Sequence, residues 1–175
     1  MKQIKAEELN ENPFKLIDKD WMLITAEKEG RTNMMTASWG GLGILWGKEV
    51  ATVYIRKSRF TKGFVDDGQT FSLCVLDEGY RNQLAYCGQI SGRDEDKVKA
   101  TGLTVEHAAI STKEGDFSVP YFSQSRLVLI CKKLYAQEMK AECFTECGKD
   151  IPSSMYSDND WHTIYVAQIE QILVK

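Results

Sequence analysis

The chain has 175 residues, of which 43% are hydrophobic and 27% are charged, and its formal net charge is −3. This length can bury the core of one domain, and no repeat, low-complexity tract or linker divides it, so we expect one domain over residues 1–175. The mixed, slightly acidic charge excludes the basic field that attracts nucleic acid or an anionic membrane surface. No apolar run reaches the roughly 18–20 residues that a membrane-spanning helix needs.

The N-terminus and the cysteines bear on the compartment. The first residues, MKQIKAEELNENPF, contain no apolar core of a secretory signal. An odd number of irregularly spaced cysteines in such a chain indicates free thiols in a reducing compartment, so we expect the cytoplasm. The two histidines, His107 and His162, have no companions at metal-ligand spacing, and no metal site is expected. The cysteines are Cys74, Cys87, Cys131, Cys143 and Cys147.

The first half of the chain alternates between apolar and turn-forming segments. Trp21–Ala26 is rich in β-branched and aromatic residues and predicts a strand. Glu27–Arg31, which is polar and contains a glycine, predicts a hairpin loop. Further strands are predicted at Thr32–Ser38 and Val50–Ile55. A helix is then predicted over about Ser58–Asp67, with its first serine as the cap.

A strand predicted at Thr70–Leu76 precedes two more helices. The first spans Asp77–Cys87, with the aspartate as its cap and Gly88 as its stop signal. The second spans Asp94–Thr101, begins with acidic residues that suit a helix N-terminus, and ends at Gly102.

Two long strands, Leu127–Tyr135 and Trp161–Val174, complete the predicted elements, and the second has the near-alternating pattern of one buried face. Strands therefore outnumber helices and are joined by hairpins, short helices and longer loops. This pattern predicts a mainly β fold, an antiparallel β-barrel with peripheral helices, rather than a doubly wound sheet. No G-x-G-x-x-G or G-x-x-x-x-G-K-[ST] segment marks a dinucleotide site or a P-loop.

The segment Asn33–Gly43, NMMTASWGGLG, allows two interpretations. Such residues gather in turns, because they hydrogen-bond locally or tolerate positive φ. They also supply the side-chain donors and exposed backbone N–H groups that line a ligand, with Trp39 offering a flat face. Composition alone leaves both interpretations open.

A second polar cluster, Arg56–Thr61 (RKSRFT), follows a strand and opens a helix. Arginine forks, hydroxyls and unpaired helix N-terminal amides favour a phosphate. Arginine is mildly unfavourable at a helix N-terminus, so two arginines there indicate an anion that offsets the cost. The alternative is a solvated basic helix start.

Two further segments, when each is taken alone, are explained by ordinary structural roles. Ser91–Lys97, SGRDEDK, is typical of a loop that feeds an exposed helix. In Asp158–Val166, DNDWHTIYV, His162 begins a hydrophobic strand, where a lone histidine is more often structural than a ligand.

Together, the four segments resemble the flavin reductase-like, FMN-binding split-barrel family, especially its flavoredoxin-type branch. The motifs are N-M-M-T-A-S-W-G-G, R-K-S-R-F-T, S-G-R-D-E-D-K followed by A-T-G-L-T, and D-W-H-T-I-Y-V. Each motif alone is common, but four in this order and approximate spacing are specific. The resemblance runs from about Trp21 to the C-terminus and implies an antiparallel Greek-key split barrel.

The resemblance implies a role for each matched residue. Asn33 would hydrogen-bond the polar edge of the isoalloxazine, and Trp39 would pack beside the flavin. Thr36 and Ser38 would supply hydroxyl or backbone contacts from the same strand end. The residues expected around the ribityl phosphate are Arg56, Ser58, Arg59 and Thr61.

Two later residues also match family positions. Lys97 matches the lysine that reaches the cofactor, with Arg93 as a second candidate, and His162 matches the family histidine in D-x-H-T. The family pairs two barrels so that FMN lies at the dimer interface, which implies an obligate homodimer.

The function implied by the resemblance is that of an FMN-dependent oxidoreductase that takes hydride from NADH or NADPH. The alternative is a flavoredoxin-type electron carrier, or an FMN-binding protein without nicotinamide activity, which would exchange electrons with a redox partner protein. No nucleophile–base pair suggests hydrolysis, and no protein residue is expected to be catalytic.

Overall fold

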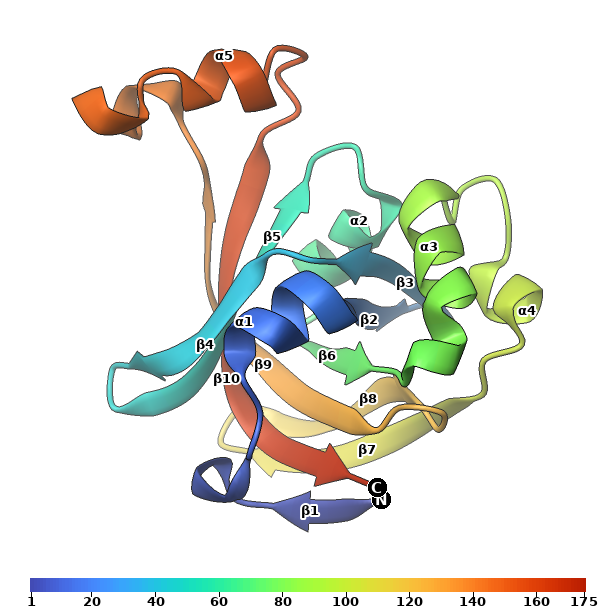
Figure 1. Ribbon diagram of the computed structural model, residues 1–175. Coiled ribbons are helices and arrows are strands. Elements are labelled where there is room, and N and C mark those ends of the chain that lie inside the picture. Colours follow the sequence, from blue (N-terminus) through green and yellow to red (C-terminus); the bar gives the residue numbers. More distant parts are fainter.

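The computed structural model describes all 175 residues and is mainly β, with short helices around the strands (Figure 1). The strands are β1 (Lys2–Ile4), β2 (Met22–Lys28), β3 (Arg31–Ala37), β4 (Gly40–Leu45), β5 (Lys48–Arg56), β6 (Thr70–Val75), β7 (Val105–Thr112), β8 (Gly115–Phe122), β9 (Leu127–Glu138) and β10 (His162–Val174).

The helices are short and lie outside the sheet. The α-helices are α1 (Pro13–Lys15), α2 (Phe60–Asp67), α3 (Arg81–Gln89), α4 (Lys97–Thr101) and α5 (Ile151–Met155). Single turns of 3-10 helix lie at η1 (Ala6–Glu8), η3 (Glu78–Tyr80), η4 (Ala141–Cys143) and η5 (Glu146–Gly148), and a π turn, η2, spans Leu16–Asp20.

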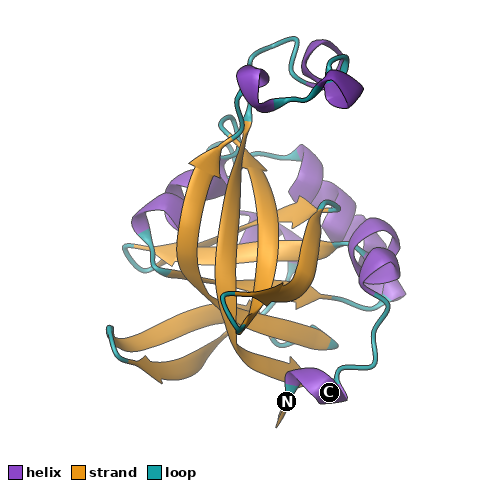
Figure 2. Ribbon diagram, turned by 90° about the vertical axis from the view of Figure 1, so that its left-hand side faces the viewer, coloured by secondary structure: helices purple, strands orange, loops and turns teal.

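Eight strands form one antiparallel sheet in the order β3-β2-β6-β9-β10-β5-β4, with β1 paired to the end of β10. The sheet is strongly curved (Figure 2), but β3 and β4 are its two edges and do not pair with each other. The antiparallel, mainly β architecture is thus confirmed, whereas the predicted barrel does not close. The pairing of β1 with β10 brings the two chain ends side by side (Figure 1).

The hairpin loop predicted at Glu27–Arg31 is confirmed as a tight turn between β2 and β3. Lys28 pairs with Arg31 in the sheet, and the two residues between them, Glu29 and Gly30, have φ values of 52° and 74°. Two consecutive positive φ angles give the backbone twist that matches a two-residue hairpin.

The glycine-rich end of Asn33–Gly43 is a strand, β4, and not a turn. β3 stops at Ala37, and after two residues the chain pairs with β5 as an edge strand. A Cβ on Gly40 would lie 2.7 Å from the backbone oxygen of Thr52, so only glycine lets the strands approach here. The short β1 and the hairpin β7–β8 are also absent from the predicted elements.

The start of α2 differs from the prediction. The helix begins at Phe60, with Arg59 in the N-cap position and no side chain capping it. Ser58 does not cap the helix, because its hydroxyl donates to Asp160 instead, at 2.6 Å.

Gly88 does not stop α3, which begins at Arg81 after η3 and continues through Gly88 to Gln89. A glycine usually ends a helix by taking positive φ, which Gly88 does not do. α4 is shorter than predicted and is capped by Asp96, but it ends at Gly102, at φ 67°, as expected.

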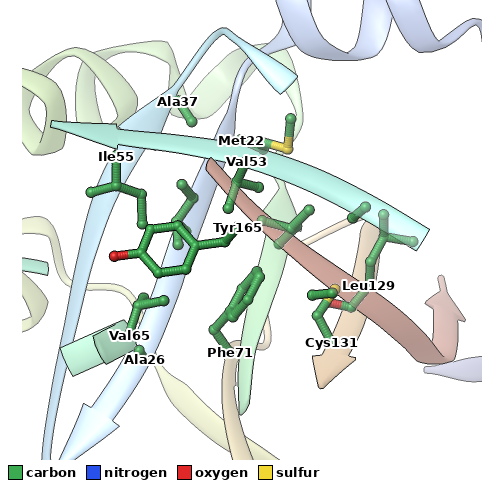
Figure 3. Close-up of a cluster of buried hydrophobic side chains, with 14 of the residues drawn as sticks. Met22, Ala26, Ala37, Val53, Ile55, Val65, Phe71, Leu129, Cys131 and Tyr165 are labelled. Carbon is green, nitrogen blue, oxygen red and sulfur yellow. The ribbon is translucent and has the colours of Figure 1, made fainter. Parts of the chain in front are cut away.

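The main core is enclosed by the curved sheet and α2, and Tyr165 of β10 lies at its centre (Figure 3). The Tyr165 ring is fully buried beside Ile55 and Val65 (Figure 3), and its hydroxyl donates to Asp66 of α2. A second apolar cluster lies where the β7–β8 hairpin covers the opposite face of β2, β6 and β9. This arrangement places the ends of β3 and β5 next to the start of β10.

The segment between β9 and β10 leaves the sheet as a lobe that carries η4, η5 and α5 (Figure 1). At its base, Trp161 stacks on Tyr156 with ring centroids 4.3 Å apart. Cys143 and Cys147 are both exposed in this lobe, whereas the other three cysteines are buried.

Candidate functional site

A cleft opens where β3 ends and where β5 meets the start of β10. Sheet pairing places His162 of β10 directly opposite Arg56 of β5. The cleft has a volume of about 310 Å³, and its lining includes six of the residues singled out in the sequence. These six are Thr36, Ser38, Trp39, Arg56, Arg59 and His162.

Trp39 and His162 form one wall of this cleft. Their ring centroids lie 5.2 Å apart with the planes tilted by 43°, and Trp39 is 46% exposed. His162 is buried, with Nδ1 2.9 Å from the hydroxyl of Tyr156. Burial, followed by the charge of Arg56, lowers the pKa of His162 to about 4. The imidazole is therefore neutral at physiological pH, and it can hold Trp39 in place but cannot supply a charge.

Asn33 and Thr61 are buried and do not line the cleft. Nδ2 of Asn33 donates to Oγ1 of Thr61 at 2.9 Å, and both residues are buried. Gly92 packs directly on the Asn33 side chain and on Phe60. These contacts join the first half of β3, the start of α2 and the S-G-R segment.

Arg56 and Ser58 are tied to the segment that precedes β10. Arg56 donates to the backbone oxygens of Asp160 (3.1 Å) and Met155 (3.0 Å). The backbone N–H and the hydroxyl of Ser58 donate to the Asp160 carboxylate at 2.9 and 2.6 Å. The carboxylate thus takes up the Ser58 donors that the sequence assigned to a phosphate.

A second hollow of about 440 Å³ adjoins the cleft and shares Arg56, Arg59 and Met155 with it. Ser91 and Arg93 of the S-G-R segment line its far side. Arg59 donates to the backbone oxygen of Gly88 at 2.6 Å and has no carboxylate among its hydrogen-bond or ion-pair partners. Because Arg59 occupies the N-cap of α2, its charge and the positive end of the helix dipole meet here, which favours an anion.

Lys97 lies under α3 and does not line the cleft. Its ammonium group is buried and donates to the backbone oxygen of Cys87 at 3.2 Å. Burial lowers its pKa to about 8. Thr36 also contacts this helix, through a hydrogen bond from its hydroxyl to the backbone oxygen of Leu84. Lys97 and Thr36 therefore help to position α3 beside the cleft.

Tyr156, Tyr54 and Met155 line the site but were missed in the sequence. Together with residues of the lobe, Tyr54 and Tyr156 surround a mostly apolar hollow of about 490 Å³ on the other side of Trp39 and His162. No motif includes these three residues, and only the register of β5 and the path of the lobe bring them to the site. Asp160, by contrast, belongs to the segment Asp158–Val166, which the sequence did single out.

No group of three or more His, Cys, Asp or Glu residues is arranged to hold a metal ion. None of the helices is long and apolar enough to cross a membrane.

A family model described as a flavin reductase-like domain matches residues 16–175. This range includes every residue of the cleft described above and all four sequence motifs.

Known structures share this fold over nearly the whole chain. A flavoredoxin from Methanosarcina acetivorans is 18% identical, with a TM-score of 0.65, and the match covers 100% of this chain and 76% of that one. An FMN-binding protein from Thermus thermophilus, with bound p-hydroxybenzaldehyde, is 18% identical at a TM-score of 0.64, covering 100% and 82%.

A third structure is an NADH:FAD oxidoreductase from Streptomyces globisporus C-1027 in complex with NAD and FAD fragments. It is 13% identical at a TM-score of 0.58, and the match covers 89% of this chain and 74% of that one. At these identities the three structures establish a common fold.

Proposed function

The chain belongs to the flavin reductase-like family, and from this we propose that it binds FMN in the cleft beside Trp39 and serves as an NAD(P)H-dependent flavin oxidoreductase. The observation that carries the proposal is the continuity of the cleft. An aromatic wall of Trp39 and His162 leads through Arg59 into a basic hollow at the start of α2.

The residues present fit an FMN molecule in chemistry and in size. The two adjoining hollows, of about 310 and 440 Å³, are of the size that small-molecule sites have in proteins. The exposed Trp39 offers a flat apolar face for an isoalloxazine. Arg59 has no carboxylate partner and supplies fork-shaped donors of the kind that bind a phosphate.

The roles of the other predicted residues follow from their positions. Thr36 and Ser38 would contact the ring from the end of β3, and Arg56 would close the cleft opposite His162. Asn33, Thr61 and Lys97 would act from behind, by holding β3, α2 and α3 in place. Ser58 would act through Asp160, which keeps the loop before α2 against the start of β10.

When bound, FMN would supply the redox chemistry, and the chain would bind, orient and shield it. The neutral His162 would add no charge beside the ring, while Arg59 would balance the phosphate. The mostly apolar hollow beyond Trp39 would exclude water from one side of the ring.

We further propose that the functional unit is a homodimer with FMN at the interface. The support is a set of exposed apolar side chains near the cleft and along the β4–β5 hairpin. Ile44 is 71% exposed, and Trp46 is 59% exposed at φ 54°. Exposed apolar side chains that lie together are the kind of surface that a second copy would cover. Sedimentation analysis of the flavin-loaded protein tests this, because a monomer at micromolar concentration would contradict it.

An anaerobic titration tests the main proposal. The purified protein should be yellow or take up FMN, and NADH or NADPH should bleach the bound flavin. Failure to bind FMN would remove the flavoprotein assignment. A yellow protein that neither nicotinamide bleaches would instead be the flavoredoxin-type electron carrier, an alternative that the fold shared with flavoredoxin supports.

A further inference from the structure

A larger hollow, of about 920 Å³, lies on the other side of the start of α2. The β2–β3 hairpin, α2 and the end of β9 border this open hollow, and only two of its lining residues are hydrophobic. Its lining contains six cationic side chains and three carboxylates. The six are Lys28, Arg31, Lys57, Arg59, Lys62 and Arg93.

The three lysines are neutralised by carboxylates. Lys57 lies 3.0 Å from Glu138, Lys62 lies 2.7 Å from Asp66, and Lys28 pairs with Asp67. The positive charge that remains in the hollow therefore belongs to the arginines.

The three arginines have no carboxylate partner. Arg31 donates to the backbone oxygen of Gly92, and Arg93 donates to that of Ser58 at 2.9 Å. Both guanidinium carbons contact one ring, that of Phe60, at 5.3 and 5.1 Å from its centroid. Each guanidinium carries five N–H donors, so most of these donors are left for a ligand. Glu29 is the one lining carboxylate that pairs with none of the lysines, so the three arginines leave the hollow with an excess of positive charge that an anion would balance.

We propose that this hollow binds the phosphate groups of a nucleotide other than the flavin, with Arg31 and Arg93 as the phosphate-binding residues. A nucleotide fits the volume, which lies within the range of small-molecule sites. The negative charges of several phosphate groups match the excess of cationic side chains. The guanidinium groups of Arg31 and Arg93, which both lie over the Phe60 ring, have the donor geometry that phosphate oxygens accept. An apolar ligand would find little surface here besides Phe60 and Phe64.

The wall between this hollow and the flavin cleft consists of Arg59, Phe60 and Arg93, which line both this hollow and the adjoining one of about 440 Å³. A nucleotide anchored in the larger hollow could therefore extend toward the flavin cleft as the electron donor. That donor role rests on the proposed function, whereas the phosphate site itself does not.

Calorimetric titration with ADP, using adenosine as the phosphate-free probe, tests the site. The protein is used both saturated with FMN and without added flavin. ADP should bind in both forms, adenosine should bind far more weakly, and rising ionic strength should weaken ADP binding. Arg31→Gln should weaken ADP about tenfold, because a charge-assisted, forked contact is lost. Arg31→Lys should recover part of the affinity.

The matched control is Lys19→Gln, which removes one exposed positive charge outside this hollow and should leave ADP affinity unchanged. Arg31→Gln should also leave the ratio of FMN to riboflavin affinity unchanged. If ADP competes with FMN, or if Arg31→Gln lowers that ratio, the arginines serve the flavin phosphate and the proposal is overturned. ADP that fails to bind either form also overturns it. Because the flavin-free titration stands alone, loss of the flavoprotein assignment would not be mistaken for loss of this site.

Discussion

The side-chain amide of Asn33 donates a 2.9 Å hydrogen bond to the hydroxyl of Thr61, and both groups are buried where β3 meets α2. This bond joins the strand that leads to Trp39 to the helix that begins after Arg59. The position of the Trp39–His162 wall relative to the basic hollow at Arg59 therefore depends on this buried hydrogen bond. Neither Asn33 nor Thr61 lines the cleft or the adjoining hollow.

Thr61→Val should destabilise the fold without changing phosphate recognition. The substitution leaves the Asn33 amide buried without its acceptor, which costs about 1–3 kcal/mol. Urea unfolding should show this loss, whereas Thr61→Ser, which keeps the hydroxyl, should remain near wild type. The ratio of FMN to riboflavin affinity should stay constant in Thr61→Val. A full-stability variant that loses its preference for FMN would place Thr61 on the phosphate.

Stability should depend on pH through His162. Its pKa is about 4 in the folded protein against 6.5 in the reference state, so the unfolded chain binds more protons between these values. The free energy of unfolding should therefore rise with pH from about 4 to 6.5 and then level off with respect to this group. His162→Gln should flatten that part of the curve. An unchanged slope in His162→Gln would mean that other groups carry the dependence.

The buried Lys97 should lower the free energy of unfolding at neutral pH. Burial lowers its pKa from 10.5 to about 8, so the unfolded state binds more protons between these values and stability rises with pH across them. Lys97→Met should therefore be more stable than the wild type at pH 7, and the gap should narrow between pH 8 and 10.5. The exposed Lys99 on the same helix gives the control, because Lys99→Met should change stability little. Equal gains from both variants would contradict the role of burial.

Gly92→Ala should loosen the S-G-R segment. A Cβ there would overlap the Asn33 side chain and lie 3.0 Å from the Phe60 ring, so the loop or the ring has to move. The expected result is a lower free energy of unfolding and weaker FMN binding. Gly63→Ala is the matched control: it has open space around its Cβ and lies inside α2, where alanine is favoured by about 0.5–1 kcal/mol. If both substitutions raise stability, the packing at Gly92 is not tight.

Local sequence signals located most of the secondary structure. Trp21–Ala26 and Val50–Ile55 are rich in β-branched and aromatic residues, which favour a strand whichever strand it pairs with. Both segments form strands, β2 and β5. The helix ends were less predictable, because Ser58 and Gly88 are typical cap and stop residues whose tertiary surroundings use them differently. The sequence suggested that Gly40 is a turn residue. The structure shows that its lack of a side chain instead allows the close approach of β4 to Thr52 of β5.

The sequence by itself determined six of the ten strands, the order of the four motifs and, through them, the family. Only the tertiary structure decided which motif residues reach the cleft. Trp39, Arg59 and His162 line it, whereas Asn33, Thr61 and Lys97 are buried behind it. The physical reason is that strand propensity and motif identity depend on neighbours in the chain. The exposure of a side chain depends on strand register and helix packing, which join residues far apart in sequence.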